Sequence, residues 1–278
     1  MNMFQSPYRG SSPMSALQKG ILAAAAILFV TSAQSSAALL AYEGFDYTAG
    51  TDVNASNGGT GWTTAWNNDA AGRWDNTSGS LSYGSLPTSG GKASLINSSS
   101  PEIQRTFSNA PTTGTLWISW LHDSTSVDSF NQLRLHQGDA NTNRVATIGA
   151  HAVTPASQTW TLYNGSFGSP VNSGIAMTGT QFVVLGIDLA TDTFSLYINP
   201  ALGATAPATA SATATFANAF TIDTLRYVIH SPAATGDPSI DEIRIGTSYA
   251  DVAAVPEPSV FGLLGLSTAG LALIRRRQ

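Results

Sequence analysis

The 278-residue chain contains no cysteine, which excludes disulfide bonds and thiolate-ligated zinc sites. Charged residues make up only 10% of it, and lysine occurs only as Lys19 and Lys92. An average globular protein has about 25% charged residues, so this surface is weakly charged. Phosphate binding needs clustered Lys and Arg, and the net charge here is -5 with no basic stripe. The sequence therefore argues against a nucleic-acid partner.

Familiar catalytic motifs are also missing. No two histidines have the His-x-x-x-His spacing of a zinc site, and no Gly-x-Ser-x-Gly elbow occurs. A glycosidase needs two carboxylates facing one sugar, but the adjacent Asp241 and Glu242 would face opposite ways in a regular strand. We therefore expect a chain that is not an enzyme. The histidines, expected at strand surfaces, are His122, His136, His151 and His230.

The composition that remains favours a folded β domain. Hydrophobic residues account for 42% of the chain, and Gly, Ser, Thr, Ala and Asn are abundant, which is typical of strands and turns rather than of disorder. Once the two ends are set aside as targeting segments, roughly 200 residues remain, a normal size for one β-sandwich.

Short runs of alternating hydrophobic residues lie between clusters of Gly, Asn, Ser and Pro. The clearest pair, 181–189 and 193–199, is joined by Ala190-Thr191-Asp192 and predicts a hairpin with one buried face. Asp188 and Asp192 flank this turn and are expected to cap it. The Ala- and Thr-rich stretch 203–215 is expected to be an exposed loop or edge segment. The ten predicted strands are 39–45, 102–107, 115–122, 131–137, 144–149, 159–163, 181–189, 193–199, 225–230 and 239–246.

No long helical period follows residue 38 until the C-terminal tail. The predicted fold class is therefore all-β, a two-sheet antiparallel β-sandwich or jelly roll over residues 39–252.

The N-terminus has the layout of a secretory signal. Arg9 and Lys19 precede an apolar stretch, 21–30, and small residues follow it up to Ala37 and Ala38. Residues 1–38 are therefore predicted to be a signal peptide, handled by the secretion machinery and cleaved by signal peptidase. An uncleaved membrane anchor is the alternative.

The C-terminal segment 253–278 has three parts in order. Val255-Pro256-Glu257-Pro258 precedes the uncharged stretch 259–274, and Arg275-Arg276-Arg277 follows it. Sixteen helical residues would extend ~24 Å, a marginal membrane span that the arginines could complete on the cytoplasmic side. We therefore predict a single transmembrane helix at 259–274.

These parts resemble the PEP-CTERM sorting signal, which consists of Pro-Glu-Pro, a short hydrophobic helix and a terminal basic cluster. The resemblance covers residues 255–278. It implies recognition by exosortase, a membrane-embedded processing enzyme, in Gram-negative bacteria that make exopolysaccharide. After transient anchoring in the inner membrane, the protein would reach the cell surface, the outer membrane or the extracellular matrix. An ordinary tail anchor that is never processed is the alternative.

The region between the ends resembles laminin-G-like, concanavalin-type jelly rolls. The resemblance lies in the segments 41–47, 58–62, 197–200 and 240–246 and extends over roughly residues 39–252. Such folds include sugar binders, hydrolases and inert spacers, so the resemblance implies a fold rather than an activity.

Calcium is the one cofactor for which the sequence offers candidate ligands. Jelly rolls of this kind often hold Ca²⁺ at the rim of the sandwich, and carboxylates in loops are its preferred ligands. Glu43, Asp237 and Asp241 would be the ligands if the first and last strands pair. The alternative, which we favour, is that Glu43 and Asp241 balance Arg244 in surface ion pairs.

Tryptophans are the candidates for contact with carbohydrate. Trp62, Trp66 and Trp74 crowd one Gly/Asn-rich region, where exposed indoles could stack on sugars, although burial in the core is the commoner outcome. Trp117, Trp120 and Trp160 lie in predicted strands and are expected in the core.

Taken together, the sequence predicts an exported protein that exosortase processes, with a structural or adhesive β-sandwich in the exopolysaccharide layer. The first alternative is a calcium-dependent carbohydrate-binding module, and the second is an unrecognised glycan hydrolase. Apart from exosortase, signal peptidase and the membrane, exopolysaccharide is the candidate partner.

Overall fold

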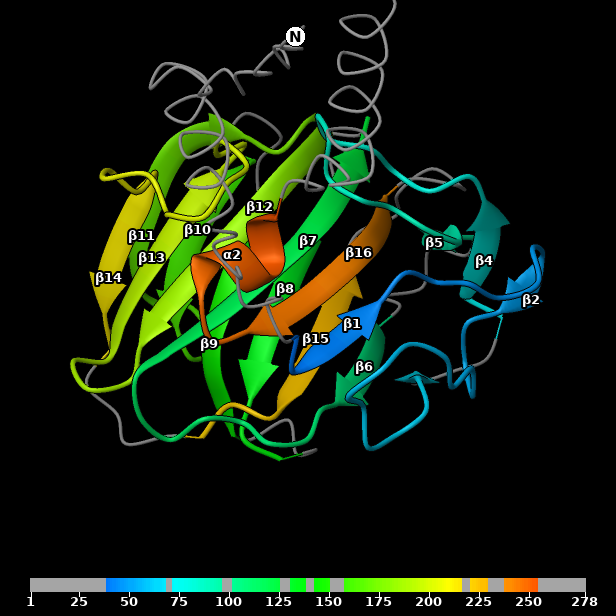
Figure 1. Cartoon of the computed structure of the whole chain (residues 1–278), viewed down its shortest axis with the longest axis horizontal. Coiled ribbons are helices and arrows are strands. Elements are labelled where there is room, and N and C mark those ends of the chain that lie inside the picture. Colours follow the sequence, from blue (N-terminus) through cyan, green and yellow to red (C-terminus); the bar gives the residue numbers. More distant parts are fainter. Residues whose placement is uncertain are drawn as a thin grey trace, which may run out of the picture. The chain divides into compact units, whose positions relative to one another are not determined.

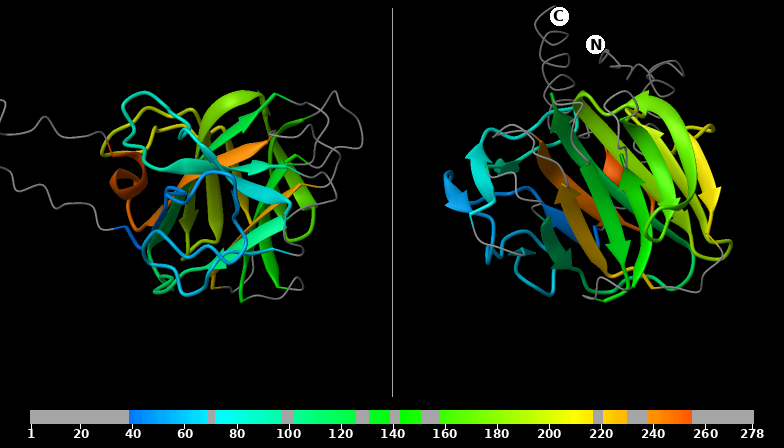
Figure 2. Two further views of the ribbon diagram at one scale, coloured as in Figure 1. Left: turned by 90° about the vertical axis from the view of Figure 1, so that its right-hand side faces the viewer. Right: turned by 180° about the vertical axis from the view of Figure 1, so that it is seen from behind.

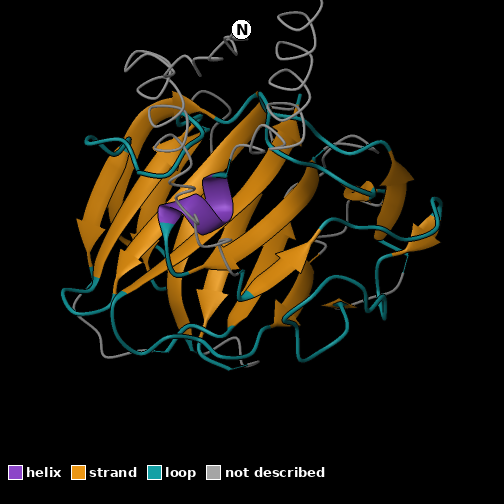
Figure 3. Cartoon of the chain, viewed as in Figure 1, coloured by secondary structure: helices purple, strands orange, loops and turns teal. Residues whose placement is uncertain are grey.

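The computed structural model describes residues 39–68, 72–96, 102–125, 131–138, 143–150, 158–216, 221–229 and 238–254. These residues form two antiparallel sheets and one short helix, drawn in purple in Figure 3. The predicted signal peptide and the predicted helix at 259–274 lie outside them. Within these ranges, no helix is both long and apolar enough to cross a membrane.

The larger sheet has nine strands. A short strand, β1 (Ala41–Glu43), pairs with the second half of β16. The other eight, in order across the sheet, are β14 (Ala212–Thr215), β13 (Thr193–Ile198), β12 (Gly179–Asp188), β7 (Thr115–Ser124), β16 (Ser239–Gly246), β5 (Gly91–Leu95), β4 (Trp74–Ser78) and β2 (Thr51–Asp52) (Figure 1).

The smaller sheet has seven strands and forms the second layer, which Figure 2 shows from behind. In order, they are β11 (Gly168–Ala176), β10 (Thr159–Asn164), β9 (Arg144–Gly149), β8 (Asn131–His136), β15 (Thr224–Ile229), β6 (Glu102–Thr106) and β3 (Asn67–Asn68).

The prediction of an all-β, two-sheet antiparallel sandwich is confirmed, and each of the ten predicted strands corresponds to an observed one. The strands that the pattern missed are β2, β3, β4, β5, β11 and β14. They are short or rich in Gly, Ser, Asn and Thr, so they carry little hydrophobic alternation. The segment 203–215 ends in β14, which lies at the edge of the larger sheet, with Ala212 and Ala214 facing inward.

The main core fills the space between the sheets. The predicted hairpin is confirmed as β12 and β13, and its inward side chains include Val183, Leu185 and Phe194. Asp188 caps the turn as predicted, because its Oδ1 accepts hydrogen bonds from the backbone N–H groups of Ala190 and Thr191. The apolar side chains exclude water from both inner faces, which is the main stabilising effect in a chain without disulfides.

A second apolar cluster lies on the outer face of the larger sheet. Helix α2 (Tyr249–Ala253) packs there against β7, β12 and β16 (Figure 1). Its N-terminus is fixed by a capping box between Ser248 and Asp251. Because Phe182 and Val184 face this cluster, β12 is buried on both of its faces.

Strand β16 contains a bulge that the hydrophobic pattern of residues 239–246 does not predict. Asp241 and Arg244 pair with Leu121 and Ser119 of β7, so two residues of β16 lie opposite one residue of β7. Glu242 takes up the extra residue with a φ of 52°. The expectation of a regular strand was therefore wrong.

The bulge directs both carboxyl groups toward the segment 79–90, which crosses the outer face. Asp241 accepts hydrogen bonds from the hydroxyl of Ser80 and the backbone N–H of Leu81, while Glu242 accepts one from the backbone N–H of Ser89. Arg244 pairs with Glu242, so the expectation that it balances Glu43 and Asp241 at the surface was also wrong.

Candidate functional site

Glu43, the first candidate calcium ligand, is fully buried at the centre of a hydrogen-bond network. Its Oε2 accepts from the indole Nε1 of Trp66 at 2.9 Å, from the hydroxyl of Tyr47 at 2.7 Å and from the guanidinium of Arg105. Its Oε1 accepts from the backbone N–H of Phe45 at 2.8 Å. Four donors therefore surround this carboxylate, and the arrangement ties β1 to the segments around it.

The first and last strands do pair, with Glu43 opposite Ile243, but this pairing does not bring the predicted ligands together. Glu43 contacts residues of the main core, whereas Asp241 bonds to Leu81 of the outer cluster. Asp237 lies outside the described residues. Within the described ranges, no three His, Asp or Glu side chains gather closely enough to hold a metal ion.

Burial changes the acidity of the carboxyl groups in the bulge. Desolvation is the largest effect on Asp241 and raises its pKa to about 8. The hydrogen bond from Ser80 lowers this pKa but does not cancel the rise. Desolvation also raises the pKa of Glu242, while the guanidinium of Arg244 opposes that rise. Both groups lie under the segment 79–90 and hold it in place.

The three tryptophans considered as candidates for contact with carbohydrate lie mostly inside the sandwich, which is the commoner outcome for such residues. Trp66 is 2% exposed and Trp74 is fully buried. Trp62 is partly buried, donates its Nε1–H to the carbonyl of Tyr42 at 2.9 Å and lies under the guanidinium of Arg105. These indoles anchor the loops between β1 and β4 to the core.

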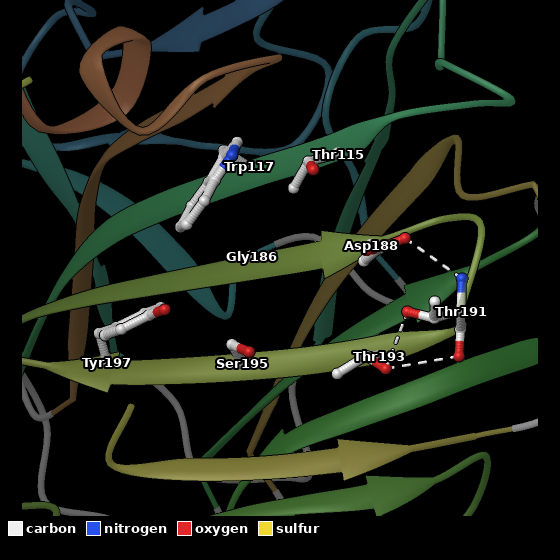
Figure 4. Close-up of a pocket in the computed structure, with 8 residues that line it drawn as sticks. All are labelled: Thr115, Trp117, Gly186, Asp188, Thr191, Thr193, Ser195 and Tyr197. Atoms are coloured by element: carbon white, nitrogen blue, oxygen red, sulfur yellow. Dashed lines mark hydrogen bonds between the residues drawn. The ribbon is translucent and has the colours of Figure 1, made fainter. Parts of the chain in front are cut away.

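A groove with a different set of residues opens on the outer face of the larger sheet. Its volume is about 270 Å³. Figure 4 shows Trp117 and Tyr197 toward one end, the turn after β12 at the other, and Gly186 and Ser195 between them. We call it the Trp117 groove. Its lining residues are Thr115, Trp117, Gly186, Asp188, Thr191, Thr193, Ser195 and Tyr197.

The strand register explains how the groove forms. Gly186 of β12 lies between Trp117 of β7 and Ser195 of β13, and Asp188 lies in the next outward row. Because Gly186 has no side chain, the indole of Trp117 can lie over the strand. A Cβ at position 186 would be only 2.8 Å from Trp117 Cη2. Glycine at this position therefore makes the space that the indole occupies.

Aromatic contacts fix the indole from the other side. The rings of Trp117 and Tyr197 are stacked with centroids 6.1 Å apart, and Tyr249 of α2 meets Trp117 edge-on at 5.4 Å. Burial raises the pKa of Tyr249 to about 12, so its hydroxyl stays neutral and donates to the carbonyl of Ala201. The wall of the groove is thus held by β13 and α2.

The polar groups of the groove are largely unused by the protein. In the part of the chain that the structure describes, the hydroxyls of Thr115, Ser195 and Tyr197 and the indole N–H of Trp117 have no hydrogen-bond partner. Asp188 uses Oδ1 to cap the turn, which leaves Oδ2 open. The groove therefore combines an aromatic wall with several available donors and acceptors.

Trp117 was expected in the core, and that expectation was wrong, whereas Trp120 and Trp160 are buried as expected. The signal was present in the alternation: if Val183, Leu185 and Ile187 face inward, then Gly186 faces outward. An isolated glycine in a hydrophobic strand often marks close approach by another group. The run 115–122 has apolar side chains on both of its faces, such as Trp117 on one and Ile118 on the other, so the alternation did not distinguish the outward face.

Solved structures similar to this chain include several β-sandwich domains. The potassium-bound carbohydrate recognition domain of Emp46p is 9% identical, with a TM-score of 0.40, over 58% of this chain and 85% of that one. A β-1,3-glucanase from Mycobacterium marinum is 13% identical, with a TM-score of 0.43, over 76% and 100% of the two chains. Likenesses this distant carry no argument about what this chain binds or does.

No curated protein sequence matches the chain. Residues 254–277 match the PEP-CTERM protein-sorting motif, which confirms the resemblance seen at Val255-Pro256-Glu257-Pro258 and Arg275-Arg276-Arg277. Of the matched residues 254–277, only Ala254 lies in the described part of the structure. The motif shows that the chain is an exported protein, recognised by exosortase and processed at the membrane.

Proposed function

We propose that this protein is a structural or adhesive component of the exopolysaccharide layer and that it holds polysaccharide through the Trp117 groove. The observation that carries the proposal is the combination, in an open groove, of an indole wall with the hydroxyls of Ser195 and Thr115, which bond to no described residue. A pyranose ring has an apolar C–H face and a rim of hydroxyls. The first can pack on an aromatic ring and the second can bond to short polar side chains.

The sorting motif supports a three-part organisation of the chain. Residues 1–38 would be removed by signal peptidase, residues 39–252 would form the exported sandwich, and residues 253–278 would hold the protein in the inner membrane until exosortase acts. The mature protein would then be displayed on the cell surface or outer membrane, or released into the matrix, where polysaccharide is its partner.

Retention by immobilised polysaccharides tests this function. The full chain, held in detergent, would be applied to a panel of neutral glycans beside Trp117→Ala and Phe167→Ala. Phe167 is a matched control, because it is a partly exposed aromatic in the turn between β10 and β11 of the other sheet. We expect retention by the wild type and by Phe167→Ala and its loss in Trp117→Ala. Equal retention of both variants would contradict the proposal.

Two added readouts test the alternatives. If a chelator abolished retention, the domain would be a calcium-dependent carbohydrate-binding module, for which Glu43, Asp237 and Asp241 were the predicted ligands. If reducing sugar were released from the glycans, the domain would be a hydrolase. We expect no chelator effect, because no three His, Asp or Glu side chains gather at one place among the described residues. We expect no release of reducing sugar, because Asp188 is the only carboxyl group among the described residues that line the Trp117 groove, and a glycosidase requires two.

A further inference from the structure

The Trp117 groove has an uneven distribution of charge. Among the described residues that line it, Asp188 is the only acidic one, and none is Lys, Arg or His. Asp188 forms no ion pair with any described residue. A ligand in the groove therefore meets one uncompensated carboxylate.

The position of this carboxylate is fixed rather than free. Its Oδ1 accepts from the backbone N–H groups of Ala190 at 2.9 Å and Thr191 at 3.2 Å. On either side, Thr115 and Thr193 are its direct cross-strand neighbours. Figure 4 shows the Asp188 carboxylate at the turn end of the groove, with a bond to Thr191. The open Oδ2 is thus held at the turn end of the groove, one outward row beyond Gly186 and Trp117.

We propose that the Trp117 groove accepts uncharged sugar chains and rejects uronic acids, with Asp188 as the residue that sets this selectivity. The inference rests on the proposed function. A neutral sugar can donate a hydroxyl to Oδ2, and hydrogen bonds to a charged acceptor are stronger than those between neutral groups. A uronate places a second carboxylate at the same end, where like charges repel and no cation of the groove compensates them.

The repulsion is modest because the groove is open to water. Two unit charges about 4 Å apart interact by about 1 kcal/mol in water and by more near a protein surface, which corresponds to a preference of about fivefold to tenfold. Salt screens charges over a Debye length of about 10 Å at 0.1 M, so the preference should narrow as ionic strength rises.

The test compares a soluble neutral β-glucan with the same polymer oxidised at C6 to uronate, using the full chain. The variant Asp188→Asn keeps the oxygen that caps the turn and removes the charge. The control is Asp192→Asn, which removes the same charge from the same turn at a residue that does not line the groove. The backbone φ of Asp192 is 53°, a conformation that asparagine adopts readily.

At low salt, we expect the wild type and Asp192→Asn to bind the neutral polymer about fivefold to tenfold more tightly than the oxidised polymer. In Asp188→Asn, the affinities for the two polymers should agree within about twofold. Equal binding of both polymers by the wild type, or an unchanged preference in Asp188→Asn, would overturn the selectivity while leaving the binding function intact. Failure of the wild type to bind either polymer, or any glycan in the neutral panel, would overturn the proposed function and this inference with it.

Discussion

Trp117 and Gly186 face each other across β7 and β12, and the indole occupies the space that a side chain at position 186 would need. This pairing explains why a tryptophan in the middle of a strand lies on the outer face of the sheet. It also makes the shape of the groove depend on a residue that contributes no functional group. The missing side chain is as important to the site as the aromatic ring.

Replacing Gly186 by Ala should displace the indole and weaken glycan retention. The new Cβ would lie 2.8 Å from two carbons of the Trp117 ring, so the ring must tilt. Overpacking of this kind costs about 1 to 3 kcal/mol, partly offset by the lower entropy of the unfolded chain. Urea unfolding would measure the change in stability, and retention on a neutral glycan would measure the site. Retention equal to that of the wild type would show that the indole is not the binding wall.

The buried pair of Glu43 and Arg105 should be a strong determinant of stability. In Glu43→Gln, the guanidinium of Arg105 would lose its carboxylate partner while remaining buried, and the hydroxyl of Tyr47 and the indole of Trp66 would lose a charged acceptor. Breaking a buried pair costs about 3 to 5 kcal/mol. Denaturant midpoints would reveal this loss.

A double-mutant cycle with Arg105→Met separates the pair from the rest of the network. We expect the double variant to be less destabilised than the sum of the two single variants. Strictly additive losses would mean that Glu43 acts through Trp66 and Tyr47 rather than through the ion pair.

Stability should fall as the pH rises from about 4 to about 8. The folded protein raises the pKa of Asp241 to about 8, whereas an unfolded aspartate has its ordinary value of 3.8. Between these values the folded state binds the proton more tightly than the unfolded state does. The free energy of unfolding is therefore greatest at acidic pH and decreases as the pH rises through the folded pKa of Asp241. Glu242, whose pKa is also raised, contributes in the same direction. The total change is on the order of 2 to 5 kcal/mol.

Unfolding midpoints measured across this range test the carboxyl group directly. In Asp241→Asn the slope should become much shallower, even though Ser80 and Leu81 lose part of their acceptor and the variant is less stable at acidic pH. An unchanged slope in this variant would assign the pH dependence to other groups.

Processing of the two ends can be measured on the protein from its native host. Intact mass of the chain from the cell envelope and the medium should correspond to a protein that begins near Leu39 and ends near Pro256, because signal peptidase and exosortase would remove the flanking segments. A mass that still includes residues up to Gln278 would indicate an unprocessed tail anchor.

Much of the fold was predictable because its central strands alternate clearly. The hairpin of β12 and β13 could be predicted to within two residues at each end from residues such as Val183, Leu185 and Phe194. The bulge at Glu242 could not, because it depends on the contact of two carboxylates with a segment about 150 residues earlier in the chain. Strands such as β11, with little apolar alternation, were likewise invisible to a pattern method.

The candidate site was less predictable than the fold. Tryptophans were sought in the Gly/Asn-rich region, but Trp66 and Trp74 pack into the core because large indoles are strongly stabilised by burial. Trp117 became visible only after the register placed it over Gly186. The Trp117 groove is assembled from residues of three strands, β7, β12 and β13, and no single stretch of sequence contains it.

Titration of the protein with a neutral β-glucan, followed through the six tryptophan indole N–H signals in an NMR spectrum, tests the central claim most directly. The indole N–H of Trp117 donates to none of the residues that the structure describes, whereas Trp62, Trp66 and Trp160 donate theirs to other residues. We expect the Trp117 signal to shift progressively with added glucan while the other five stay in place. Shifts confined to Trp62 or Trp66, or an unchanged Trp117 signal at a glucan concentration that saturates binding, would contradict the proposal that the Trp117 groove holds the glycan.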